Sequence, residues 1–265
     1  MTVMTARNSA RWICTSLVLA LVALLAQSPA AKSRTPAAHD ELPSAAQIVG
    51  DYLDVLGGVA ALEQVRTRNV RGTRQFGSEG STHAFSLQQM HPNRWLVRLE
   101  QPEGAWLMGS DGVQAWEQPP RGRPELLDGV AQADARREWD IQRDLVLRRE
   151  FPEMIVHGIV SFDGLDCYLV EARPVAGQGR TAWLYFGAPT KFLLQREYRE
   201  DGPEGQRVWQ IRYSEYRDVK GVKYPFQIQR IGPDGEWTLR ATDVQHNVKL
   251  PNDMFRLPDS LARQK

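Results

Sequence analysis

The most regular hydrophobic pattern lies in the last third of the chain, where short apolar runs alternate with turn residues. The stretch "AWLYFGAPTKFLLQREYRE" holds two such runs, and "VWQIRYSEYRDVKGVKYPFQIQRIGPDGEWTLRATDV" holds three more. In the middle run, Val222, Tyr224, Phe226 and Ile228 fall on one face, which is the period of two expected of a half-buried strand. The pattern predicts an antiparallel meander.

The same rhythm occurs earlier in the chain. From Arg68 the segments "NVRGTRQF", "THAFSLQQMH", "NRWLVRLEQ", "AWLMGSDG" and "VQAWEQ" read as five strands, and "MIVHGIVSF" and "LDCYLVEARP" flank a turn at Asp163-Gly164. We expect one long, strongly twisted antiparallel sheet of about ten strands, curled into an unclosed half-barrel.

Two regions have helical spacing instead. Ser44 is placed to cap a helix through "AAQIVGDYLDVLGGVAALEQV", with Tyr52 on its apolar stripe and Gly57-Gly58 ending or kinking it. A second helical region covers roughly Gly129 to Arg149 and contains Trp139. The predicted fold class is therefore α+β, mainly β, with helices covering the concave face of the sheet.

The N-terminus has the layout of a secretory signal peptide. Arg7 and Arg11 precede the apolar run "LVLALVALLA", and small residues follow it, which predicts cleavage after Ala30. The alternative is an uncleaved anchor, but the apolar core is shorter than the roughly 20 residues that a spanning helix needs. We expect a signal peptide over 1–30, a flexible tether over 31–43, a single domain over 44–258 and a polar tail over 259–265.

The charge balance disfavours nucleic acid as a partner. Removing residues 1–30 removes two arginines and no acids, which leaves 31 basic against 32 acidic residues. Of the two cysteines only Cys167 then remains, so no intramolecular disulfide is expected.

Sequence motifs for catalysis and metal binding are absent. None of the five histidines forms an HxxxH or HExxH pair, no serine has GxSxG spacing, and no glycine-rich nucleotide loop follows a strand, so we expect no metal and no cofactor. A hydrolase using Cys167, with His157 brought near in space, or an acidic pair including Asp163 and Asp166, is the least supported hypothesis. We expect a protein that is not an enzyme.

Bulky apolar residues suggest what the curled sheet holds. Seven of the eight tryptophans lie beyond the predicted signal peptide, and indole and thioether side chains suit a pocket for apolar ligands. The candidate ligand contacts are Tyr52, Trp95, Trp106, Trp139, Trp183 and Phe226.

Four segments carry a family resemblance: "AQIVGDYLDVLGGVAALEQVRTRNVRG", "AWLYFGAPTKFLLQRE", "YRDVKGVKYPFQIQR" and "DVQHNVKLPNDMFRLP". In this order they resemble the outer-membrane lipoprotein carrier or sorting superfamily of Gram-negative bacteria (Lol-type), over roughly Ser44 to Pro258. The resemblance implies a half-closed β-barrel covered by helices, whose apolar cavity shelters acyl chains in the periplasm. Insertions around Pro119 to Arg149 and Asp201 to Gln206 extend beyond the shorter carriers.

Two functions from different classes follow. The first is an exported periplasmic binding protein that shelters a lipid or acyl chain, with a role in lipoprotein or lipid trafficking, and with helices near Tyr52 and Trp139 as the gate. The second is a non-enzymatic structural or interaction protein of the cell envelope that docks a partner such as a periplasmic peptidase or an assembly complex. A filled interior would favour the second.

Overall fold

The computed structural model describes residues 33–34, 41–176, 179–202 and 205–263. The predicted signal peptide, 1–30, and most of the predicted tether lie outside the described residues.

Strands make up most of the described chain. Their bounds are β1 (Ser33–Arg34), β2 (Thr67–Phe76), β3 (Thr82–Met90), β4 (Arg94–Leu99), β5 (Trp106–Asp111), β6 (Ala115–Gln118), β7 (Glu125–Leu126), β8 (Glu153–Phe162), β9 (Leu165–Arg173), β10 (Ala182–Gly187), β11 (Leu193–Gly202), β12 (Gly205–Val219), β13 (Val222–Gly232) and β14 (Gly235–His246).

Helices are short and few in the described residues. They are α1 (Ala45–Val55), α2 (Val59–Glu63), α3 (Gly129–Trp139), α4 (Leu147–Glu150), the 3-10 turn η1 (Asn252–Phe255) and α5 (Asp259–Ala262).

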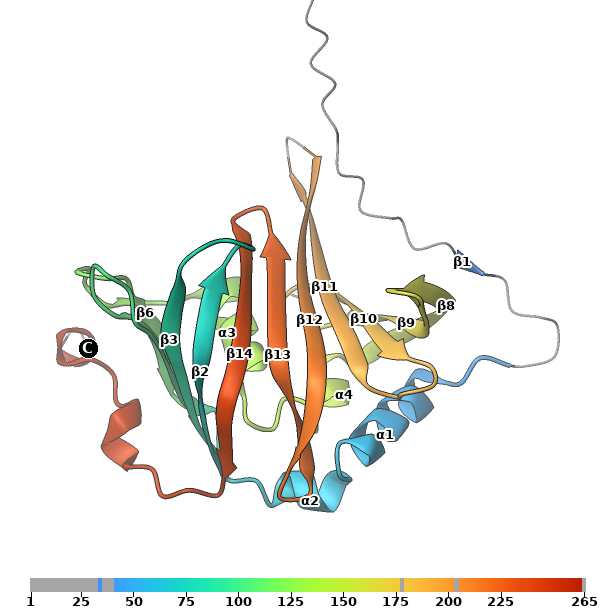
Figure 1. Cartoon of the computed structure of the whole chain (residues 1–265), viewed down its shortest axis with the longest axis horizontal. Coiled ribbons are helices and arrows are strands. Elements are labelled where there is room, and N and C mark those ends of the chain that lie inside the picture. Colours follow the sequence, from blue (N-terminus) through green and yellow to red (C-terminus); the bar gives the residue numbers. More distant parts are fainter. Residues whose placement is uncertain (1–32, 35–40, 177–178, 203–204, 264–265) are drawn as a thin grey trace, which may run out of the picture. The chain divides into compact units, whose positions relative to one another are not determined.

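The fourteen described strands form one antiparallel sheet that is not closed (Figure 1). Its order is β1-β8-β9-β10-β11-β12-β13-β14-β2-β3-β4-β5-β6-β7. The predicted fold class is confirmed, but the expected count of about ten strands was too low. The apolar runs identified in the sequence became β2 to β6 and β8 to β14. The remaining two strands, at the sheet edges, have only two residues each, too short to show a period of two.

The helix at the start of the domain forms as its sequence predicts. The Ser44 hydroxyl accepts a hydrogen bond from the Gln47 backbone N–H at 3.2 Å, and the Gln47 side chain accepts one from the Ser44 N–H, a capping box. The two glycines then separate α1 from α2. Gly57 has φ +126°, and a Cβ there would lie 2.2 Å from the Gly221 carbonyl oxygen, so only glycine lets this corner approach the β12–β13 turn.

The sheet has two faces with separate hydrophobic clusters. The larger cluster includes Val70, Trp95 and Leu184 from the strands and Tyr52 from α1. We call the face that carries it the inner face. Figure 1 looks at the strands with α3 and α4 behind them. The smaller cluster, Val160, Cys167 and Tyr185, takes residues that alternate with inner-face ones, and it marks the outer face.

The segment 129–150, which we call the covering segment, is less helical than the sequence predicts. α3 ends at Trp139, and turns occupy 140–146 before α4 begins. Asp140 is extended, with φ −62° and ψ 128°, and its carboxylate accepts a hydrogen bond from the Gln142 N–H at 2.9 Å. This local bond offers the backbone an alternative to the helical ladder, so the helix stops there. The turn aims Arg143 and Asp144 at the sheet.

Among the described residues, no helix combines the length and the apolar character needed to cross a membrane.

Candidate functional site

A buried arginine lies at the centre of the inner face. Arg196 of β11 has a side chain that is 1% exposed, and its Nη1 lies 3.4 Å from the Glu138 Oε2 of the covering segment and 3.5 Å from the Tyr198 hydroxyl. The Tyr213 hydroxyl is buried there and has no hydrogen-bond partner within the described residues. We call Arg196, Glu138, Arg143, Tyr198 and Tyr213 the Arg196 cluster.

The covering segment supplies the acids of this region. Glu138 Oε1 also lies 3.0 Å from Arg143 Nη1, and Asp144 Oδ1 accepts a hydrogen bond from the Tyr52 hydroxyl at 2.9 Å. Burial raises the pKa of the Tyr52 phenol, and the Asp144 charge raises it further, so this tyrosine is a neutral donor at physiological pH. The inner face thus meets the covering segment through charged and hydrogen-bonded groups as well as apolar ones.

A second polar chain links the sheet to the end of α3. Arg68 Nε donates to His246 Nε2 at 3.1 Å, and Arg68 Nη1 donates to Gln89 Oε1 at 3.2 Å. Gln89 Nε2 in turn donates to the Trp139 carbonyl at 2.7 Å. Burial first, and then the Arg68 charge, lower the pKa of His246 to about 4, so the imidazole is neutral and accepts the Arg68 hydrogen bond.

The space between the inner face and its cover is nearly filled. A cavity of about 10 Å³ lies among Tyr52, Arg68, Arg143, Tyr213 and their neighbours, which is room for about one water molecule. The sequence predicted an apolar cavity with room for a ligand in this place. Tyrosine and arginine side chains fill it, among them Arg143 from the turns at 141–146 of the covering segment.

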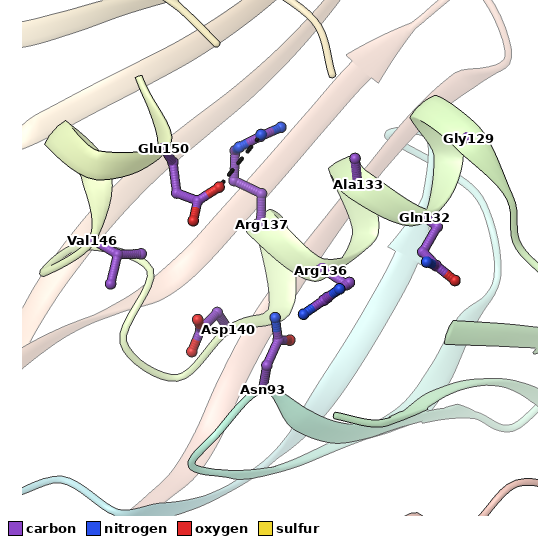
Figure 2. A pocket seen from close by; sticks show the side chains of 9 residues that line it. All are labelled: Asn93, Gly129, Gln132, Ala133, Arg136, Arg137, Asp140, Val146 and Glu150. Carbon is purple, nitrogen blue, oxygen red and sulfur yellow. Dashed lines mark hydrogen bonds and ion pairs between the residues drawn. The ribbon is translucent and has the colours of Figure 1, made fainter. Parts of the chain in front are cut away.

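A larger cavity, of about 340 Å³, is polar. It lies between α3, α4 and the β3–β4 turn, and Figure 2 shows Arg137 and Glu150 pointing toward each other while Arg136 lies beside Asn93. Arg137 Nη2 is 3.5 Å from Glu150 Oε2. Burial raises the pKa of Asp140 in this cavity. The lining residues are Asn93, Gly129, Gln132, Ala133, Arg136, Arg137, Asp140, Val146 and Glu150. This is also not the apolar cavity that was predicted.

Five of the six predicted ligand contacts lie on or against the inner-face cluster. Tyr52 and Trp95 are in it, and Trp106, Trp139 and Phe226 pack against it.

Trp95 and Trp139 contact each other, with ring centroids 6.3 Å apart, whereas the Tyr52 ring contacts Phe186 at 5.4 Å. Trp183 does not join them. It packs against the outer-face cluster, beside His157 at 4.9 Å, because it alternates with the inner-face Leu184 along β10.

The sequence reasoning missed the inward-facing arginines Arg68, Arg74 and Arg196. Of the other strand arginines, Arg98 is 49% exposed, and Arg212 donates a hydrogen bond to Gln195 at 3.1 Å. The alternation of side chains along a strand could have identified two of the missed arginines. Arg68 and Arg74 are an even number of residues from the buried Val70 of the same strand, so they lie on its face.

Cys167 has the environment of a structural thiol. Its side chain is buried on the outer face, and burial and the nearby Asp166 charge raise its pKa to about 11, opposite to the shift that activates a nucleophile. His157 pairs with Glu171 at 2.8 Å instead. Among the residues that the structure describes, no group of three histidine, cysteine or acidic side chains is arranged to hold a metal ion.

Several solved structures share the fold of this chain. No protein-family model matches the sequence, and no curated protein matches it. Solved structures do match. A LolA superfamily protein from Nitrosomonas europaea is 17% identical, with a TM-score of 0.55 over 82% of this chain and 99% of that one.

Two further structures have the same fold. A DUF1329 family protein from Desulfovibrio piger has a TM-score of 0.57 at 14% identity, over 80% of this chain and 96% of its own. A domain from Vibrio parahaemolyticus, named for outer membrane lipoprotein sorting, has a TM-score of 0.54 at 13% identity, over 82% of this chain and 100% of its own. The resemblance stated from the sequence is confirmed at the level of the fold.

Proposed function

We propose that this chain is an exported, periplasmic binding protein without enzymatic activity, which shelters a lipid or lipoprotein acyl chain between its inner face and the covering segment. Export rests on the N-terminal pattern, with cleavage after Ala30. The fold supports binding because a curled, unclosed sheet presents a large inner face that its own strands do not cover.

The observation that carries the proposal is the way the covering segment lies on that face. Beneath it are Trp95, Leu184 and other fully buried side chains, which belong to the sheet and form an apolar floor. The segment contributes Ala135, Ile141 and Leu147 to the inner-face cluster and packs Trp139 on Trp95, and Glu138 and Asp144 add polar contacts. Displacing it would expose an apolar floor without unfolding the sheet.

Acyl burial supplies free energy that competes with those contacts. At about 0.8 kcal/mol for each buried methylene, eight methylenes would contribute about 6 kcal/mol before ordering costs. The filled state described here is then the closed form, and an arriving acyl chain selects an open form in which α3 and the turn after it have moved.

The second candidate function is the envelope interaction protein, and the filled interior favours it. A space of about 10 Å³ between cover and floor holds no acyl chain. If the covering segment never moves, the protein functions through its surface, which docks an envelope partner.

The test uses the full chain, expressed with its own N-terminal segment and purified from the periplasm. N-terminal sequencing checks the cleavage site, and native mass spectrometry checks for a copurified lipid. Titration with the neutral apolar dye Nile red then measures binding, with Trp139→Ala and the outer-face Trp183→Ala as a matched pair. We expect saturable binding, tightened several-fold by Trp139→Ala because the open form is more populated, and unchanged by Trp183→Ala.

An empty protein that does not bind the dye saturably, in the original chain and in Trp139→Ala alike, would exclude acyl sheltering and leave the interaction protein.

A further inference from the structure

One arginine of the inner face is surrounded by aromatic rings. The guanidinium carbon of Arg74 lies 4.3 Å from the Trp237 ring centroid, 4.8 Å from that of Phe76 and 6.0 Å from that of Trp106. These rings come from β14, β2 and β5. Two strands separate β2 from β5 in the sheet, so Trp106 reaches Arg74 because the sheet curls there. We call these four residues the Arg74 cluster.

No salt bridge joins this arginine to a carboxylate of the described residues, although the charge of Asp234 acts on it from a distance. Within the described part of the chain no carboxylate pairs with Arg74, and its Nε is buried without a hydrogen-bond partner. The buried indole N–H of Trp237 has none either. The acids nearby are engaged elsewhere, since Asp234 pairs with Arg230 at 2.8 Å and Glu117 accepts a hydrogen bond from Trp106 at 2.7 Å.

The surroundings make the positive charge costly. Burial, and then the Arg230 charge, lower the pKa of Arg74 to about 10, which still leaves it protonated at neutral pH. Cation–π contact with the rings offsets a part of this cost. An anion would offset more of it, and guanidinium binds carboxylate or phosphate oxygens through two parallel hydrogen bonds.

The cluster is also within reach of a ligand. Arg74, Phe76, Trp106 and Trp237 are all partly exposed, unlike the fully covered Arg196. The apolar inner face continues beside them, with Leu239 paired opposite Arg74 in the sheet and 3% exposed. A charged head and an apolar floor are therefore adjacent.

We propose that the Arg74 cluster binds the anionic head group of an amphiphile, a carboxylate or a phosphate, whose acyl chain lies along the inner face. The inference rests on the proposed function and names its ligand class. Arg74 donates to the head-group oxygens, the Trp237 indole N–H is a further donor, and the rings of Phe76 and Trp106 pack on the first methylenes of the chain.

The experiment compares ligands that share one saturated chain and differ in the head: a fatty acid, the corresponding lysophosphatidic acid and the uncharged fatty alcohol. Each is titrated against Nile red bound to the full chain. Because the dye is neutral, removing a charge has no direct effect on its binding. We expect at least one of the two anions to displace the dye about tenfold more effectively than the alcohol, a ratio typical of a charge-assisted contact. The better anion identifies the head group.

Two substitutions on one strand form the matched pair. Arg74→Gln should reduce the preference for the anion to about onefold while the alcohol binds as before. Arg71→Gln, at an exposed position on the outer face of β2, should leave the preference intact. Arg74→Lys keeps the charge but not the planar guanidinium group, so it should retain part of the preference for the anion. This variant also tests the inference if Arg74→Gln does not fold.

The outcomes separate the two ideas. If acid, phosphate and alcohol displace the dye equally, or if Arg74→Gln keeps the preference, the head-group inference is wrong and acyl sheltering stands. If the dye itself does not bind saturably, the proposed function fails first.

Discussion

The Arg196 cluster and the Arg74 cluster belong to the same face of the same sheet, yet the two guanidinium groups have different partners. Arg196 is enclosed and meets Glu138 of the covering segment at 3.4 Å. Arg74 is partly exposed and meets only aromatic rings. The sheet supplies a cation in both places, and the covering segment supplies an anion in one of them.

The difference shows what each cation does for the protein. At Arg196 the carboxylate of Glu138 satisfies the charge within the chain, which fixes the position of the covering segment. At Arg74 no carboxylate of the described residues forms a salt bridge with the charge, which costs stability. A partly exposed cation without a salt bridge in the described residues, next to an apolar floor, is therefore the better candidate for contact with a ligand, and two substitutions test this contrast.

The largest effect is expected from Arg196→Leu. The change removes the inner-face partner of Glu138 and leaves that carboxylate partly buried with only Arg143 beside it. Breaking such a buried pair should lower the free energy of unfolding by about 3 kcal/mol. Urea denaturation measures the change in the free energy of unfolding. Arg207→Leu is the control, since Arg207 of the neighbouring strand β12 is 53% exposed, pairs with the 40% exposed Glu200 and should cost under about 1 kcal/mol. Equal costs for the two variants would remove the distinction drawn for Arg196.

A smaller effect is expected from acidification, through His246. Its pKa in the folded protein, about 4, lies below the ordinary 6.5, so between these values the unfolded chain binds a proton that the folded protein does not. Stability should therefore fall as the pH drops from about 6.5 to 4, by on the order of 1–2 kcal/mol after allowance for solvent screening.

The variant His246→Gln tests the assignment, because its amide oxygen can still accept the Arg68 hydrogen bond but does not titrate. Denaturation midpoints at pH 7 and pH 5 should differ less in the variant than in the original chain. An unchanged difference would assign the acid sensitivity to other groups.

The smallest effect is expected from Arg74→Leu. Losing the ring contacts lowers the free energy of unfolding, whereas removing a largely desolvated charge raises it. The free energy of unfolding should therefore stay within about 1 kcal/mol of the original. Thermal and urea denaturation would both report it. A loss as large as that for Arg196→Leu would mean that Arg74 is a structural cation, and the contrast between the clusters would be wrong.

Much of this fold was predictable because period-two alternation and turn residues act locally. The meander around Val222 and Tyr224 and the Ser44 cap depend on neighbours within a few residues. The filled interior was not predictable in the same way. It depends on Arg143 and Asp144 turning inward from an insertion, a contact across the fold that no local pattern contains.

The same distinction between local patterns and contacts across the fold applies to the candidate site. Alternation could place Arg74 on the face of Val70, but only the curl of the sheet brings Trp106 to it from β5. Trp183 was grouped with the inner aromatic residues on composition, where the parity of β10 would have separated it.

The pairing of β14 with β2 determines when the chain can fold. β14 contains some of the last strand residues to be synthesised, yet it lies between β13 and β2 in the interior of the sheet, where Val244 pairs with Val70. Until β14 is available, β2 has an open edge and the two halves of the sheet are not joined. Such a long-range pairing cannot form until β14 has been synthesised, and non-local pairings are among the slower steps of folding. A chain cut short before β14 therefore lacks the strand that joins the two halves of its core.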